Sequence, residues 1–175
     1  MSEADGAGSS RDDHKQDAAR SAEKLSKLCT DHGLHVAVAE SLTGGRIASQ
    51  LAAASGSGDW LAGGIVAYSS EVKHTLLEVP RGSVISRASA ESMVRSVARL
   101  LGADVAVAAT GAGGPNGQDG EEPGTTWIAV LVADEVTAQL HHFSGKPIEV
   151  LTQMQEQALR ALLRPIAVRF GTVRS

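Results

Sequence analysis

The sequence is poor in cysteine and in aromatic residues. Cys29 is the single cysteine among 175 residues, which excludes an intramolecular disulfide and a metal site built from several cysteines. Phe, Trp and Tyr make up only 3% of the chain, so the core must come from small aliphatic residues within its 42% hydrophobic content. Such side chains suit close packing of helices on a sheet. One domain with one sizeable core is therefore expected, in a reducing compartment such as the cytoplasm.

The sequence also lacks a basic stripe and a long hydrophobic run. Its formal net charge of -4 gives no long-range attraction to nucleic acid or to an acidic membrane surface. No run reaches the roughly 18 apolar residues of a membrane span, and the N-terminus has no apolar segment typical of a secretion signal. A cytoplasmic protein without nucleic-acid or membrane partners is predicted. The sequence leaves open whether it forms a homo-oligomer.

Polar and hydrophobic segments divide the chain into two parts. Residues 1–21 are rich in Ser, Gly, Asp, Lys and Arg, which predicts a disordered tail, whereas residues 22–170 carry regular hydrophobic spacing and form the expected domain. Helices are predicted up to His32 and over 43–54, 70–79, 88–101 and 147–163, with Pro165 ending the last; strands are predicted over 35–39, 61–68, 104–109, 126–133 and 136–143.

The order of these segments predicts an α/β fold. Strands and helices alternate along most of the chain, as in a parallel sheet covered by helices. Only Asp134 and Glu135 separate the last two strands, and a connection this short allows only a hairpin. One strand must therefore be antiparallel. The expected architecture is a mixed, mostly parallel sheet between helical layers.

The segment AESLTGG, residues 39–45, lies where a buried strand meets a helix. Open α/β sheets bind their ligands at the carboxyl ends of strands, and free N–H groups at a helix start can stabilise an anion. Ser41 is therefore a candidate nucleophile. An equally simple interpretation is that Ser41 or Thr43 only caps the helix. Glu40, before Ser41, needs either a partner for its carboxylate or exposure at the strand end.

A second candidate group follows the strand over 61–68. Tyr68 ends this strand and Lys73 lies one turn into the next helix, so both side chains can point toward the same crevice. A lysine acts as a base only when it is neutral, which requires burial that lowers its pKa from about 10.4. The alternative is an ordinary solvated surface lysine.

The third candidate is the glycine-rich stretch TGAGGPNG, residues 110–117. Thr110 ends a strand, and Gly111, Gly113 and Gly114 could let backbone N–H groups surround a phosphate. The pattern matches neither common nucleotide-binding motif, and a flexible turn would explain the same glycines. No histidines or acidic residues are spaced as metal ligands, so no metal is expected.

Four segments, AESLTGG, VAYSSEVKHTLLEV, VAATGAGGPNG and PGTTWIAV, occur in that order. Together they resemble the CinA C-terminal domain family, whose members include nicotinamide-nucleotide amidases, over about residues 25–163. The resemblance implies a three-layer α/β/α sandwich. It also implies a cofactor-free amidohydrolase that converts a small nucleotide, nicotinamide mononucleotide, to nicotinate mononucleotide and ammonia. A second domain that longer members carry is not expected here.

The resemblance also assigns roles to residues. Ser41 matches the proposed nucleophile, and Tyr68 and Lys73 match the catalytic tyrosine and lysine. The substrate-binding residues that it implies are Glu40, Thr43, Gly44, Gly45, Thr110, Gly111, Gly113, Gly114 and Asn116. The chain departs from the family pattern at Leu42, where Cys is common, and at Gly113, where Ala is usual. It is also one residue shorter before Pro123-Gly124-Thr125, so the loop changes affect the expected fit of the substrate.

Two other functions fit the same sequence. The chain could be a non-catalytic nucleotide-binding or interaction module of the competence and DNA-damage context, which would bind a nucleotide without releasing ammonia. It could also use the same catalytic residues on a different small amide.

Overall fold

The computed structural model describes residues 4–114 and 116–171. Its strands form one five-stranded sheet in the order β2-β1-β3-β4-β5. The strands are β1 (Val36–Glu40), β2 (Leu61–Val66), β3 (Val105–Gly111), β4 (Thr125–Val132) and β5 (Glu135–His142). The helices are α1 (Ala4–His32), α2 (Arg46–Ala52), α3 (Ser57–Trp60), α4 (Ser70–Leu76), α5 (Arg87–Leu101) and α6 (Pro147–Phe170).

The sheet is mixed, as the hairpin predicts. β1 pairs in parallel with both β2 and β3, whereas β4 runs antiparallel to β3 and to β5. Within the described chain, β4 is thus the one strand that runs against the others. β1 and β3 are buried along their whole length, because helices cover both faces of the sheet there.

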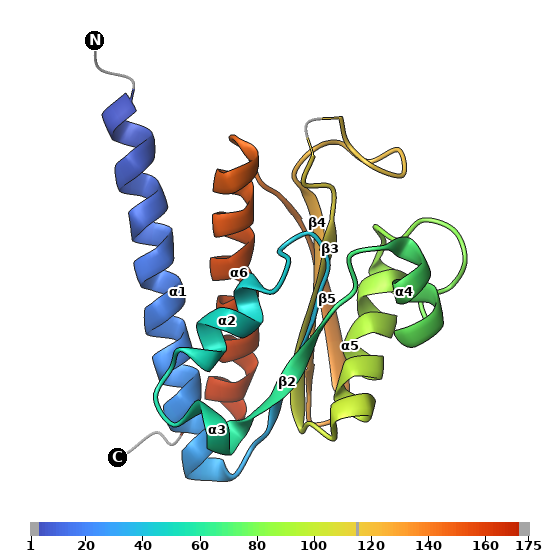
Figure 1. The fold of residues 1–175 in the computed structure, drawn as a ribbon. Helices are drawn as coiled ribbons and strands as arrows, with labels where there is room; N and C mark the ends of the chain where they lie inside the picture. Colours follow the sequence, from blue (N-terminus) through green and yellow to red (C-terminus); the bar gives the residue numbers. More distant parts are fainter. Residues whose placement is uncertain (1–3, 115, 172–175) are drawn as a thin grey trace.

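The helices form two layers around this sheet (Figure 1). α1, α2, α3 and α6 lie on one face, and α4 and α5 lie on the other. Each layer buries its own hydrophobic cluster. Ile47, Leu51 and Leu159 belong to the first, and Met93 and Val97 belong to the second. The three-layer α/β/α sandwich with a mixed, mostly parallel sheet is therefore confirmed.

The expected disordered tail over residues 1–21 is wrong for the part that the structure describes. Residues 4–21 form the first part of α1, which packs along α6. Ala18 is 1% exposed, and His14 pairs with the carboxylate of Glu156 on α6. The segment is polar by composition, but buried Ala18, together with Ala22 one turn later, gives α1 a face that fits α6. Tertiary packing therefore orders a helix that composition alone does not predict.

This correction changes the expected effect of removing residues 1–20. The deletion takes Ala18 from the core and leaves Glu156 without His14, so a loss of roughly 1–2 kcal/mol of stability is expected. For a domain of this size that loss lowers Tm by about 2–8 °C, measurable by calorimetry. His14→Ala in the full chain should give a smaller loss, the part due to the His14–Glu156 hydrogen bond. An unchanged Tm after the deletion would show that α1 contributes nothing before residue 21.

Pro165 does not end α6, contrary to the prediction. The helix continues to Phe170 with Pro165 inside it. Proline removes one backbone donor to the carbonyl four residues earlier. Ile166 beyond it is fully buried in the core, and this packing favours continuation of the helix. The short helix α3, which contains the buried Trp60, was not predicted because four residues are too few to show a hydrophobic period.

Candidate active site at the carboxyl edge of the sheet

The register of the sheet places three predicted segments beside one another. Glu40, the last residue of β1, pairs with Val66 on β2 and with Ala109 on β3. The residues that follow these positions therefore leave the same edge of the sheet. α2 follows β1 on one face and α4 follows β2 on the other (Figure 1). A chain that leaves neighbouring strands toward opposite faces opens a crevice between their ends, which is the usual ligand position in such sheets.

Ser41 lies in this crevice and lines a cavity of about 410 Å³. We call it the serine cavity. Its lining residues are Ser41, Leu42, Tyr68, Gly113, Gly114, Gly117, Gln118, Pro147 and Leu151. Ser41 is 4% exposed, and its hydroxyl has no hydrogen-bond partner in the part of the chain that the structure describes. Tyr68, in contrast, is 73% exposed. The structure thus brings Ser41, Tyr68, Gly113 and Gly114 to one cavity, as predicted.

Lys73 lies on α4 and is buried, with 1% of its surface exposed. It is therefore not the solvated surface lysine of the alternative interpretation. Burial lowers the pKa of Lys73, and the negative charge of Asp119 opposes this shift. Over the described residues, its ammonium group forms no hydrogen bond or ion pair, and it does not line the serine cavity. A buried lysine with a lowered pKa has the protonation behaviour that a general base requires.

Glu40 does not face the serine cavity. Its carboxylate accepts hydrogen bonds from the backbone N–H groups of Gly45, Ile47 and Ala48, at 3.1, 3.1 and 2.7 Å. These donors are the free N–H groups of the first turn of α2, so Glu40 acts as an anionic cap for that helix. A structural role thus explains a buried carboxylate at the end of an apolar strand.

Glu40 also changes which groups could stabilise an oxyanion. The N–H of Gly45 donates to Glu40, and that of Gly44 donates to the carbonyl oxygen of Ser41. Two of the donors expected for an oxyanion are therefore occupied. Among the described residues, the N–H groups of Leu42 and Thr43 donate to no protein atom. In α/β-hydrolases the residue after the nucleophilic serine supplies such a donor.

The glycine-rich segment owes part of its composition to packing. Thr110 is fully buried, and its hydroxyl donates to the carbonyl oxygen of Val84 at 2.7 Å. A Cβ added to Gly111 would lie 2.6 Å from the carbonyl oxygen of Thr125, and one added to Gly113 would overlap Leu42. The contact at Gly111 is with backbone and requires glycine, whereas the contact at Gly113 is with the end of the Leu42 side chain, which can shift. Thr110 and Gly111 do not line the serine cavity.

Several backbone donors of this loop are also occupied. The N–H of Ala112 donates to Thr125, that of Gly117 to Gly114 and that of Gln118 to Glu121. Gly114 borders the serine cavity and has open space around it, whereas Asn116 lines none of the cavities described here. A phosphate cradle formed by the whole loop would have to break some of these bonds, so the loop remains only a prediction as a phosphate site.

A second cavity, of about 640 Å³, adjoins the first. We call it the arginine cavity. Its lining residues are Leu42, Thr43, Gly44, Gly45, Arg46, Ser49, Gln50, Ala53, Leu151 and Gln155. Leu42 and Leu151 line both cavities, so the two adjoin at these side chains. Thr43 is 2% exposed and its hydroxyl has no partner in the described chain. Thr43, Gly44 and Gly45 therefore lie beside the serine cavity and do not line it.

Comparisons with known proteins agree with these motifs. The family model for the CinA C-terminal domain matches residues 18–166. The chain belongs to this family. It is 34% identical over 153 residues to a CinA-like protein from Flavobacterium psychrophilum, a match that covers 84% of this chain and 37% of that relative. A CinA-like protein from Gemmatimonas aurantiaca is 35% identical over 149 residues. The chain thus spans about a third of the length of these curated relatives, 37% and 35%.

Solved structures of CinA proteins share the fold. A CinA superfamily protein from Escherichia coli has a TM-score of 0.82 at 31% identity, covering 85% of this chain and 90% of that chain. The match to a competence or damage-inducible protein from Enterobacter asburiae also has a TM-score of 0.82, at 29% identity. It covers 85% of this chain and 98% of that protein. The family and the fold are therefore shown, whereas these names state no reaction.

Sequence reasoning missed four side chains that shape this CinA site. Leu42 follows Ser41 in the turn after β1, Gln118 lies in the glycine-rich loop, and Pro147 and Leu151 come from the start of α6. Leu151 is only partly buried and lines both cavities. No local motif marks it, since its place depends on how α6 docks against β3, β4 and α2.

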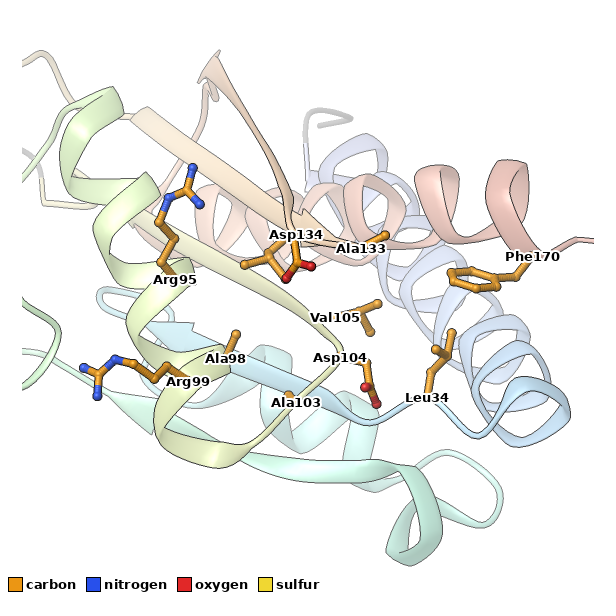
Figure 2. A pocket seen from close by; sticks show the side chains of 11 residues that line it. Leu34, Arg95, Ala98, Arg99, Ala103, Asp104, Val105, Ala133, Asp134 and Phe170 are labelled. Carbon is orange, nitrogen blue, oxygen red and sulfur yellow. The ribbon is translucent and has the colours of Figure 1, made fainter.

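A third cavity lies at the opposite end of the sheet, near the start of β3 (Figure 2). It has a volume of about 580 Å³, and none of the predicted site residues lines it. Arg95 and Arg99 from α5 extend in different directions there. Arg99 pairs with Glu78, outside the cavity lining. The polar groups therefore do not converge on one point, and the carboxyl edge remains the better candidate site.

Two further features bear on the function class. No helix over residues 4–171, Pro115 aside, is long and apolar enough to cross a membrane. Among the same residues, no three His, Cys, Asp or Glu side chains are grouped in a way that could bind a metal ion. The absence of a metal requirement stays a prediction, which chelator treatment of an active preparation would test.

The departures from the family pattern at Leu42 and Gly113 are coupled in this structure. Because a Cβ at residue 113 would overlap Cδ1 of Leu42, Gly113→Ala should lower the free energy of unfolding by about 1 kcal/mol. Leu42→Cys removes the obstructing methyl groups, so the double variant should recover most of that loss. A double-mutant cycle by urea denaturation measures the coupling. Additive effects of the two substitutions would show that these residues do not constrain each other.

Proposed function

We propose that this CinA domain is an amidohydrolase that releases ammonia from nicotinamide mononucleotide through a serine–lysine mechanism. One observation carries the proposal: the unpartnered hydroxyl of Ser41 borders a cavity at the carboxyl edge, and the same edge carries a buried lysine whose pKa is lowered. An ordinary structural serine or lysine needs neither feature. Membership of the CinA C-terminal domain family adds support, because that family includes nicotinamide-nucleotide amidases.

The first half of the reaction forms an acyl-enzyme. Neutral Lys73 takes the proton from the Ser41 hydroxyl as its oxygen attacks the carboxamide carbon. The negative charge that develops on the carboxamide oxygen is stabilised by the N–H groups of Leu42 and Thr43, where one donor can contribute about 3 kcal/mol. The C–N bond then breaks, and the leaving nitrogen takes the proton from Lys73. The products of this half are ammonia and an ester on Ser41.

The second half returns the enzyme to its starting state. Lys73 takes a proton from water, which attacks the ester carbon. The ester C–O bond breaks, Ser41 regains its proton, and nicotinate mononucleotide leaves. No hydrogen bond joins Ser41 to Lys73 among the described residues, so the reaction requires substrate binding to bring the two within reach. Tyr68, at the mouth of the cavity, is proposed to assist this proton transfer.

The proposal is tested by mixing the pure protein with nicotinamide mononucleotide and measuring ammonia and nicotinate mononucleotide. Equimolar formation of both products is expected. Turnover of another small amide in preference to this nucleotide would change the substrate and retain the mechanism. Binding of the nucleotide without ammonia release from any tested amide would support the non-catalytic binding module.

Asp119 should set the pH at which Lys73 becomes active. Its negative charge favours the ammonium form and raises the pKa of Lys73 against the effect of burial. Asp119→Asn removes that charge but keeps an oxygen to accept the N–H of Val84, a bond of 2.9 Å in the native chain. The pKa of Lys73 should then fall further, so the rising acidic limb of kcat/KM should move to lower pH. A shift to higher pH would contradict Lys73 as the base.

A further inference from the structure

The serine cavity leaves the phosphate of a nucleotide without a cation. Among the described residues, no lysine or arginine lines it, and its lining consists of apolar, glycine, hydroxyl or amide groups. The predicted alternative is the glycine-rich loop, but the N–H groups of Ala112, Gly117 and Gln118 are already donated within the protein. A dianionic phosphate bound only there would lack a charge partner, so the adjoining surface must be considered.

The arginine cavity supplies such a partner. Arg46 lines it, is partly buried, and forms no ion pair with any described residue. No carboxylate from residues 4–114 or 116–171 lines this cavity. Other arginines of this acidic chain do form ion pairs, namely Arg20, Arg81, Arg87, Arg99 and Arg160. Arg46 is thus a cation in a cavity that contains only neutral groups, and its planar guanidinium suits bidentate contact with a phosphate.

Neutral hydrogen-bond donors in the arginine cavity could also contact a phosphate held by Arg46. Gln155, which is 9% exposed, donates its side-chain amide to Oε1 of Gln50 at 3.1 Å. Because Oε1 of Gln50 accepts this bond, the NH₂ group of Gln50 remains a donor for a ligand. Ser49 adds an exposed hydroxyl. The N–H groups at the start of α2 are not needed, since Glu40 already accepts them.

We propose that Arg46 binds the phosphate of a nucleotide substrate in the arginine cavity, while the carboxamide of the same substrate lies against Ser41 in the serine cavity. Leu42 and Leu151 line both cavities, so the sugar crosses their apolar side chains. This inference rests on the proposed function for the identity of the substrate. It assigns specificity for the phosphorylated form to one side chain, which comes from α2.

The test measures binding and turnover separately. Nicotinate mononucleotide, the expected product, is titrated into the wild type, Arg46→Gln and Arg95→Gln by calorimetry. Arg95 is the matched control, because it is exposed, forms no ion pair with a described residue, and lies at the opposite end of the sheet. Arg46→Gln should weaken binding by about 10- to 100-fold, the size expected for a charged hydrogen bond, and Arg95→Gln should change nothing. Arg46→Lys should recover part of the loss, which would exclude a folding defect.

Turnover adds a comparison of nucleotide with nucleoside. Arg46→Gln should raise KM for nicotinamide mononucleotide with little change in kcat, and should leave nicotinamide riboside unaffected. Inorganic phosphate should compete with the nucleotide in the wild type and lose this effect in Arg46→Gln.

Two results distinguish the role of Arg46 from the proposed amidohydrolase activity. Equal affinity of Arg46→Gln and wild type for the product, or no binding by the wild type, would overturn the inference and return the phosphate to the glycine-rich loop or elsewhere. Binding that depends on Arg46, without ammonia release by the wild type, would support the inference and contradict the proposed activity.

Discussion

Ser41→Ala should abolish ammonia release while leaving the fold and nucleotide binding intact. The hydroxyl makes no hydrogen bond with a described residue, so its loss leaves no buried partner unsatisfied. Turnover should nevertheless fall by about 10,000-fold or more, as expected when a nucleophile is removed. Ammonia release is followed by a coupled assay, with Tm and calorimetric binding measured on the same preparation.

Ser57→Ala is the matched control for this substitution. Ser57 begins α3, and its hydroxyl donates to the carbonyl oxygen of Ala52 away from both cavities. This variant should retain wild-type turnover. Near-normal turnover of Ser41→Ala would show that the nucleophile is another group, with Thr43 or a bound water as the next candidates.

Lys73→Met should cause a comparable loss of turnover for a different reason. The unbranched methionine side chain fills most of the buried volume and removes the amine that burial disfavours as a cation, so stability should be retained or increased. Loss of the general base should lower kcat by about 100- to 10,000-fold. The rise of kcat/KM with pH that reflects deprotonation of Lys73 should be absent from the residual activity of this variant.

The double variant distinguishes a shared mechanism from two separate defects. If Ser41 and Lys73 act in one proton transfer, Ser41→Ala combined with Lys73→Met should be little worse than the more damaging single substitution. If instead the kcat of the double variant falls by the product of the two single losses, Lys73 acts in a separate step, for example in substrate binding.

The sequence predicted those elements whose position follows from local spacing. Alternating strands and helices place Ser41, Tyr68 and Thr110 at one edge, because parallel strands share the direction of their carboxyl ends. The two-residue connection after β4 predicts the antiparallel strand for a similar reason. Such features depend on neighbours in the chain and on simple geometry.

Features that depend on docking between distant segments were not predictable. The start of α1 is polar, and its helix is ordered by contact with α6 some 140 residues later, at the His14–Glu156 pair separated by 142 positions. Leu151 reaches the site only because α6 packs against β3, β4 and α2. Glu40 was expected to require a partner, but its role as the cap of α2 needs the turn geometry of Gly44 and Gly45, both with positive φ.

The central claim is that Ser41 forms an ester with the substrate, and rapid acid quench followed by peptide mass spectrometry tests it most directly. Wild-type protein is mixed with nicotinamide mononucleotide, quenched within the first turnover, and digested. The peptide that contains Ser41 should gain the mass of the nicotinate mononucleotide acyl group, and this adduct should be absent from Ser41→Ala. Release of ammonia in the first turnover with this peptide unmodified at every quench time, or with the acyl group on another residue, would contradict the account.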